Sequence, residues 1–171
     1  GDELEDLTRV CKDALVDADA ILISGGSSVG SRDLTIDVIR SLPASELLFH
    51  GVAIKPGKPT ILARVGEAAF WGLPGHVASA MVVFRVMVKR FLEHIGGMQG
   101  TQDSLRLPAV LSRNLSSTHG RQDFVRVKLE ERGGELVAVP VLGKSGLIRT
   151  MVAADGAIEI DVNTEGLDEG S

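Results

Sequence analysis

Apolar residues recur at two different spacings in the first forty residues, and these spacings predict a helix, a strand and a second helix. Residues 2–17 carry apolar side chains three or four positions apart, as one face of an amphipathic helix does. The run "ADAILIS" (18–24) is short and almost wholly apolar, which is typical of a central parallel strand. Helical spacing returns over residues 32–43, after a loop rich in glycine and serine. This order of elements is that of an α/β protein.

Three β-prone runs and a long apolar helix follow. Residues 46–75 are divided by the turn signals "KPGKP" (55–59) and "VGE" (65–67), so we expect three consecutive strands there. Residues 76–95 are apolar on most sides of a helix, which predicts that other elements cover it. Gly96 and Gly97 stand where a helix would end.

The spacing of apolar residues changes from helical to alternating after Gly97, which predicts a second domain. Valine and leucine alternate with charged residues over residues 125–130, as in a strand with one buried face. The stretch "RGGEL" (132–136) predicts a turn, and Pro140 predicts a sheet edge or a bulge. We therefore expect an α/β domain over residues 1–97 and a small all-β domain over residues 98–171.

Composition narrows the class of protein. The 171 residues are 44% hydrophobic and 24% charged, as in ordinary globular proteins, and the net charge of -5 argues against a general nucleic-acid or anionic-membrane surface. The single cysteine, Cys11, excludes an internal disulfide framework, so we expect a reducing compartment, by default the cytoplasm. The longest apolar run, residues 77–88, is short for a membrane span and contains Arg85.

The loop in "ILISGGSSVGSRDL" (21–34) has the form of an anion-binding turn. Backbone N–H groups of a glycine-rich turn between a strand and a helix can converge on a phosphate. The Walker pattern would need Lys followed by Ser or Thr after Gly30, and Gly25-Gly26 breaks the dinucleotide fingerprint. An unrelated nucleotide-binding α/β protein is therefore the least favoured hypothesis. The alternative to anion binding is a tight connection in which Ser31 or Asp33 caps the next helix.

Two further loops carry candidate ligands for an anion. Pro56-Gly57 predicts a type II turn, and Lys55 and Lys58 on either side of it could form a two-cation clamp or be ordinary surface lysines. In "GLPGHVASA" (72–80), Ser79 can donate to an anion or cap the helix. Three such loops at one end of one sheet would form a pocket.

The predicted β domain adds "HGRQDF" (119–124) with Arg121 and "GKSG" (143–146) with Lys144 and Ser145, all in turns. The four histidines have no metal-ligand spacing. Asp33 is the best-placed acid to hold a divalent cation beside a phosphate, although one carboxylate does not make a complete site.

Taken in order, "SGGSSVGSRDL", "AIKPGKP" and "GLPGHVASA" strongly resemble the MoeA-type molybdopterin molybdenumtransferases, the family that includes the gephyrin E domain. The resemblance implies a partial three-layer α/β/α molybdopterin-binding domain followed by a barrel-like β domain. It also implies insertion of molybdenum from molybdate into adenylylated molybdopterin, with release of AMP and a requirement for Mg²⁺.

Residue roles follow from the same resemblance. Asp33 matches the catalytic and metal-binding acid. The residues that match substrate-binding positions are Gly25, Gly26, Ser27, Lys55, Lys58, Gly75, Ser79, Arg121 and Ser145.

The sequence departs from the family at two points. His76-Val77 stand where the family usually has Asn-Pro. The family domain's first strands and acidic loop have no counterpart before residue 2, so we expect a C-terminal fragment, inactive alone, of a parent protein that forms a homodimer. The alternative function is a non-catalytic module that binds molybdopterin or phosphate or serves as a scaffold, favoured by the altered "PGHV".

Overall fold

The computed structural model of the chain describes residues 3–25, 34–98, 105–141, 143 and 148–171. The chain forms two compact units. The first comprises Gly1–Val52 and Gly57–Phe84, and the second comprises Ala53–Pro56 and Arg85–Ser171. The domain boundary that the sequence places near residue 97 stays a prediction.

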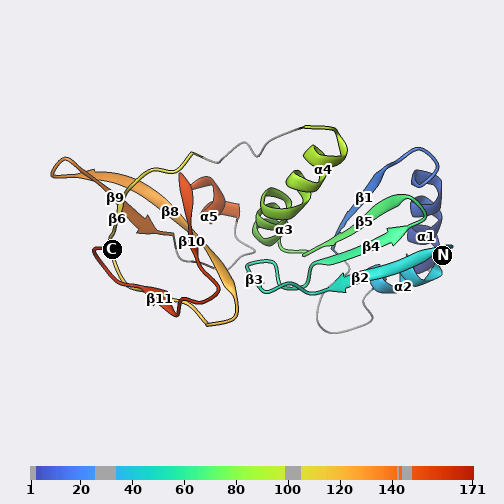
Figure 1. Ribbon diagram of the computed structural model, residues 1–171, viewed down its shortest axis with the longest axis horizontal. Coiled ribbons are helices and arrows are strands. Elements are labelled where there is room, and N and C mark those ends of the chain that lie inside the picture. The colour runs from blue at the N-terminus through green and yellow to red at the C-terminus, as the bar shows by residue number, and fades with distance from the viewer. Residues whose placement is uncertain (1–2, 26–33, 99–104, 142, 144–147) are drawn as a thin grey trace. The chain divides into compact units, whose positions relative to one another are not determined.

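The first unit contains a four-stranded sheet in the order β1-β5-β4-β2 (Figure 1). Strand β1 is parallel to β5, whereas β5, β4 and β2 pair antiparallel. The strands and the helices of this unit are α1 (Glu3–Ala14), β1 (Ala20–Ser24), α2 (Leu34–Ser41), β2 (Ser45–His50), β4 (Ile61–Val65), β5 (Ala68–Leu73) and α3 (Val77–Val83). The predicted helix, parallel strand and second helix are thus present. Residues 46–75 contain four strands instead of the expected three, because a separate short strand, β3 (Ile54–Lys55), follows β2.

The position of β1 corrects one expectation. Among the described strands β1 lies at one end of the sheet, not in its centre, and Leu22 in the middle of β1 is 38% exposed. A short apolar run alone does not distinguish a strand with neighbours on both sides from one with a single neighbour, because only the tertiary structure supplies the second partner.

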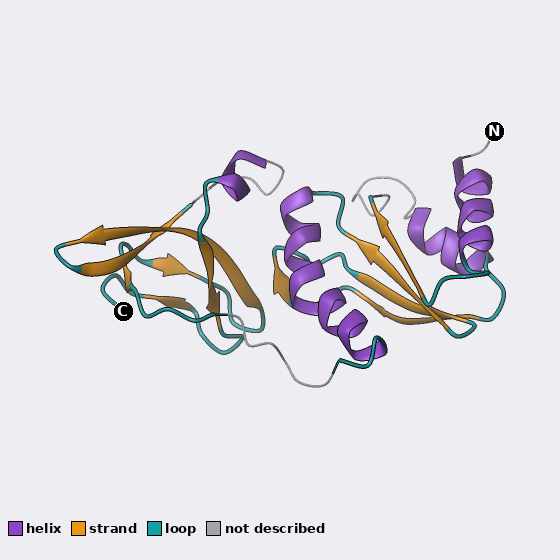
Figure 2. Cartoon of the chain, turned by 90° about the horizontal axis from the view of Figure 1, so that it is seen from above, coloured by secondary structure: helices purple, strands orange, loops and turns teal. Residues whose placement is uncertain are grey.

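Side chains from the sheet and from two helices form the core of this unit. The helices α1 and α2 cover one face of the sheet, and α3 lies on the other face (Figures 1 and 2). The buried core residues between the sheet, α1 and α2 are Cys11, Ile21, Ile36, Val38, Ile39, Leu42, Ile61, Ala63, Val65 and Phe70. Burial raises the pKa of the Cys11 thiol, since desolvation disfavours the thiolate. The α/β fold class predicted from the sequence is confirmed.

The helical run after β5 differs from the predicted helix in two respects. It consists of α3, a π-helical turn η1 (Phe84–Val88) and α4 (Lys89–Ile95), instead of one regular helix. The sequence predicts that other elements cover this run, but α4 contains no buried residue and α3 buries only Ala78, Ser79 and Val83. The predicted end is confirmed, because Gly97 has a positive φ of 75° and donates to the His94 carbonyl at 3.1 Å. No described helix is both long enough and apolar enough to cross a membrane.

The second unit is mainly β. Besides α4 and most of η1, its described elements are β3 (Ile54–Lys55), β6 (Val110–Leu111), β7 (Leu115–Ser116), β8 (Gln122–Arg132), β9 (Glu135–Pro140), α5 (Ile148–Val152), β10 (Gly156–Ile160) and β11 (Gly166–Leu167). The main sheet has the order β10-β8-β9-β6, and β3 pairs parallel with β8. Strands β7 and β11 form a separate pair, and Leu111, Leu115 and Ile160 form a small core.

Backbone geometry accounts for the turn predicted at Gly133-Gly134 and for the position of Pro140 in the sheet. Gly133 and Gly134 connect β8 to β9 with φ values of 61° and 85°, the left-handed conformation that a tight hairpin of this kind needs. Pro140 ends β9, opposite Val127 of β8, beyond the two residues that β6 pairs with. The missing N–H of Pro140 therefore removes no ladder bond to β6.

The close approach of Gly72 to α2 yields the first prediction. A Cβ atom on Gly72 would lie 2.9 Å from Thr35 Cγ2 and 3.0 Å from Ile61 Cβ. We expect Gly72→Ala to lower the free energy of unfolding by about 1–3 kcal/mol, because a packed core must shift to admit the methyl group. Urea denaturation would measure this difference.

The matched control is Gly156→Ala, since a Cβ at Gly156 would meet nothing within 4 Å. We expect that change to stay within about 0.5 kcal/mol of the unsubstituted chain. Equal stabilities of the two variants would contradict the packing argument.

Candidate functional site

The carboxyl ends of β1 and β5 bring two of the predicted loops together. The parallel register pairs Ser24 with Leu73, so the chain leaves both strands at the same edge of the sheet. Ser24 Oγ donates to the Pro74 carbonyl at 3.4 Å, and the Gly25 N–H donates to the Leu73 carbonyl at 3.4 Å. A Cβ on Gly75 would lie 3.5 Å from Gly25 Cα, so the two glycines are neighbours. Gly25 has a φ of 107°, which favours glycine there.

Thr35 supports this edge of the sheet, although the sequence pattern does not single it out. Its side chain is fully buried, and Oγ1 donates to the Gly25 carbonyl at 3.3 Å. Thr35 is the second residue of α2, so this bond ties the helix to the start of the glycine-rich loop. The spacing of apolar residues places this threonine in a helix, but nothing in the sequence indicates its burial.

Ser79 is close to the start of α3 but does not cap that helix. The N-cap residue is His76, and Ser79 is the third helical residue, whose N–H donates to the His76 carbonyl at 2.9 Å. Within the described residues the His76 side chain makes no capping hydrogen bond. The capping interpretation of Ser79 is therefore wrong. Ser79 is 6% exposed, and its role toward an anion stays a prediction.

The "KPGKP" segment forms a turn, and its two lysines belong to different units. The Lys55–Pro56 peptide bond is cis, unlike the trans bond of the type II turn expected from the sequence. Thr60 is fully buried and donates from Oγ1 to the Gly57 carbonyl at 2.6 Å, while the Lys58 carbonyl accepts the Val52 N–H at 2.9 Å. The placement of Lys55 and Lys58 on one ligand stays a prediction.

In the second unit, Lys55 and Arg121 converge on one buried carboxylate. The β3–β8 register sets Lys55 beside Asp123, and Lys55 Nζ lies 3.7 Å from Asp123 Oδ2. Arg121 Nε donates to Asp123 Oδ1 at 2.7 Å and Arg121 Nη2 donates to Asp123 Oδ2 at 3.2 Å. The side chain of Asp123 is only 3% exposed. Two of the predicted cationic residues therefore share one partner, and the three formal charges sum to +1.

Asp123 is the residue of this cluster that the sequence analysis missed. Arg121 and Asp123 are two positions apart, which puts both side chains on one face of an extended strand, and this spacing is a usable signal. The burial of the carboxylate and its contact with Lys55 depend on the pairing of β3 with β8, which the sequence pattern does not predict.

Four of the predicted site residues, Gly26, Ser27, Asp33 and Ser145, lie outside the described residues. Among the residues that are described, no group of three or more His, Cys, Asp or Glu side chains could hold a metal ion.

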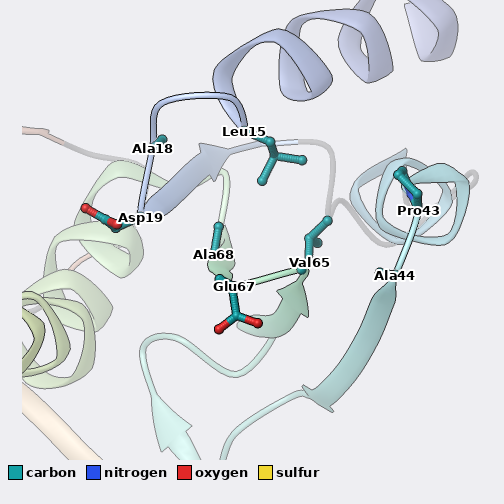
Figure 3. A pocket seen from close by; sticks show the side chains of 9 residues that line it. Leu15, Ala18, Asp19, Pro43, Ala44, Val65, Glu67 and Ala68 are labelled. Atoms are coloured by element: carbon teal, nitrogen blue, oxygen red, sulfur yellow. The ribbon is translucent and has the colours of Figure 1, made fainter.

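A cavity of about 380 Å³ lies at the opposite end of the first unit's sheet. Ala18 and Asp19 line it before β1 begins, and Glu67 lines it from the turn between β4 and β5 (Figure 3). Its described lining includes none of the candidate site residues of the sequence analysis. The loops at Gly25 and Gly75 and the cluster around Asp123 lie elsewhere, so this cavity is not the candidate site.

Comparison with known proteins identifies the class to which this fold and these loops belong. Residues 1–94 match the family described as "Probable molybdopterin binding domain", and residues 108–171 match the "MoeA C-terminal region (domain IV)". The first match covers more than half of the chain, so the chain belongs to the molybdopterin-binding domain family. The second match and the structural neighbours are of the MoeA type, which confirms the resemblance that the three motifs indicate.

Individual relatives agree with this assignment. A Methanocaldococcus jannaschii protein assigned to molybdopterin biosynthesis is 36% identical over 99% of the chain, and the Bacillus subtilis molybdopterin molybdenumtransferase is 29% identical over 99%. The crystal structure of a Pyrococcus horikoshii MoeA protein matches 99% of the chain at 36% identity, with a TM-score of 0.79. The chain spans 39% of the length of both relatives and 40% of that structure.

The hydrogen bond from the buried Thr60 hydroxyl to the Gly57 carbonyl should stabilise the "KPGKP" turn, and this can be tested. Thr60→Val keeps the side-chain shape but leaves the Gly57 carbonyl without its donor. We expect a loss of about 1–3 kcal/mol in the free energy of unfolding, because a buried polar group then lacks its hydrogen bond. The matched control is Thr8→Val, which removes an exposed hydroxyl 3.2 Å from Ser41 Oγ and should change stability by less than about 0.5 kcal/mol. A Thr60→Val variant as stable as the control would contradict the role assigned to this bond.

Proposed function

We propose that the protein to which this chain belongs inserts molybdenum from molybdate into adenylylated molybdopterin and releases AMP. The observation that carries the proposal is the convergence of Lys55 and Arg121 on Asp123 within a chain of the MoeA type. Molybdate is a tetrahedral dianion, and lysine and arginine donors are the groups that bind such an oxyanion most strongly. The relatives named molybdopterin molybdenumtransferase support the same reaction.

The strand ends of the first unit supply the second part of the proposal. Gly25 and Gly75 lie beside each other where β1 and β5 end, and neither has a side chain to block a ligand. Carboxyl ends of parallel strands are where α/β proteins usually bind ligands, and backbone N–H groups there suit a phosphate. We assign the phosphate groups of adenylylated molybdopterin to this edge, with Gly26, Ser27 and Ser79 as further ligands.

Residues outside the described part of the chain complete the proposed site. Asp33 is assigned to cleavage of the adenylate, and Ser145 is assigned to the oxyanion with Lys55 and Arg121. The role of Lys58 in substrate binding follows from the family resemblance alone. Mg²⁺ and a homodimer remain predictions that follow from the resemblance.

Molybdate binding to the second unit tests the oxyanion assignment. We expect isothermal titration calorimetry with sodium molybdate to give a dissociation constant about tenfold higher for Lys55→Gln, because one charge-assisted contact is lost. The control is Lys128→Gln, which removes a similarly exposed lysine from β8. Equal losses in the two variants would show a nonspecific charge effect and would contradict the assignment.

The role of Asp33 separates catalysis from binding. In a protein of the relatives' full length that carries this chain, we expect Asp33→Asn to abolish AMP release from adenylylated molybdopterin while molybdate binding persists. Chromatography of AMP and calorimetry would measure the two effects. Normal turnover by Asp33→Asn would remove Asp33 from the catalytic role. Binding without turnover in the unsubstituted protein would favour the scaffold module instead.

A further inference from the structure

Asp123 is the one charged side chain that is buried among the described residues. A carboxylate loses its hydration when it is buried, and this costs several kcal/mol unless hydrogen bonds and opposite charges replace the water. Arg121 donates two hydrogen bonds to the carboxylate, one to each oxygen, and Lys55 adds a second positive charge at 3.7 Å. The burial of Asp123 therefore depends on both cations being held in place.

The same contacts leave both cations able to bind a further anion. Arg121 contacts Asp123 through Nε and Nη2, and Nη2 also donates to Thr118 Oγ1 at 3.3 Å. Within the described residues Nη1 donates to no acceptor, and the Arg121 side chain is 30% exposed. The Lys55 side chain is 59% exposed. Both side chains thus have N–H groups that can reach a ligand from the solvent.

We propose that Asp123 is a positioning residue that holds the Arg121 guanidinium and the Lys55 ammonium together as one binding site for a tetrahedral oxyanion. This inference rests on the proposed function, which takes molybdate as the oxyanion. Asp123 itself does not contact the anion. The β3–β8 register sets Lys55 beside Asp123, and the carboxylate fixes the plane of the guanidinium and holds the ammonium by its charge.

A second group of two cations and one carboxylate offers a control for the Asp123 cluster, because its carboxylate is not buried. On the same strand, Arg132 donates to Glu130 Oε2 at 2.7 and 3.2 Å, and Lys128 Nζ lies 4.0 Å from Glu130 Oε1. This group also has two cations and one carboxylate, but Glu130 is 35% exposed. The Arg132 hydrogen bond lowers the pKa of Glu130 below its ordinary value. Glu130→Gln therefore removes the same charge from the same strand without disturbing a buried group.

Asp123→Asn distinguishes a positioning role of Asp123 from a purely electrostatic one, because the two roles predict opposite changes in the affinity for molybdate. Removal of the carboxylate raises the net charge of the cluster from +1 to +2, so a purely electrostatic role would strengthen molybdate binding. We expect instead a dissociation constant at least about tenfold higher by calorimetry with sodium molybdate, because the cations lose their shared anchor. Glu130→Gln should leave the constant within about twofold. Equal or tighter binding by Asp123→Asn would overturn the proposal.

Two further measurements decide the matter if Asp123→Asn does not fold, as judged by circular dichroism. Arg121→Lys keeps the positive charge but lacks the planar fork, so we expect molybdate binding to weaken about tenfold. Unchanged binding would overturn the proposal. In the unsubstituted chain, ¹⁵N NMR should show an Arg121 Nε–H signal that exchanges slowly with solvent, in contrast to the Arg132 signal. Equally fast exchange at both positions would also overturn it.

The NMR measurement also separates this proposal from the proposed function. If the unsubstituted chain binds no molybdate but the Arg121 signal is protected, the positioning by Asp123 stands and the oxyanion assignment fails. If molybdate binds and Asp123→Asn binds it equally well, the oxyanion assignment stands and the positioning role fails.

Discussion

Parallel pairing of β1 with β5 is the constraint on which the first unit depends. The register sets Ser24 opposite Leu73, so two loops that are fifty residues apart in sequence start from adjacent positions. Gly25 and Gly75 can then approach each other because neither carries a side chain. Thr35 and Gly72 secure the same edge from α2 and β5, one by a hydrogen bond and the other by allowing close packing. The first and third motifs are therefore parts of one local structure.

The second unit relies on a different interaction, the burial of a carboxylate between two cations. Strand β3 is only two residues long, yet its pairing with β8 brings Lys55 beside Asp123. Arg121 reaches the same carboxylate from the residues just before β8. A buried charge must be paired and hydrogen-bonded, so the three side chains constrain one another. This mutual constraint holds the Lys55 and Arg121 side chains beside the same carboxylate.

The sequence predicted the elements better than their environments. Helical spacing located α1 and α2, a short apolar run located β1, and turn signals and alternating spacing located the strands of residues 46–75 and the β8–β9 hairpin, because each pattern reflects local geometry. The same patterns gave the wrong environment for β1 and for the helical run after β5. Coverage of an apolar face depends on which other segments pack against it, and no local pattern contains that information. The capping interpretation of Ser79 failed for a similar reason, since the start of α3 is set by the backbone at His76.

The sequence by itself determined the class of protein, because three loop motifs in a fixed order are a property of the chain and not of its folding. It also gave Lys55, Arg121, Gly25 and Gly75 as candidate ligands, on the chemistry of their loops and on the family resemblance. Only the tertiary structure decided which of these meet. Asp123 acquires its role by burial and by contacts across two strands, and both arise from long-range pairing that residue spacing does not encode.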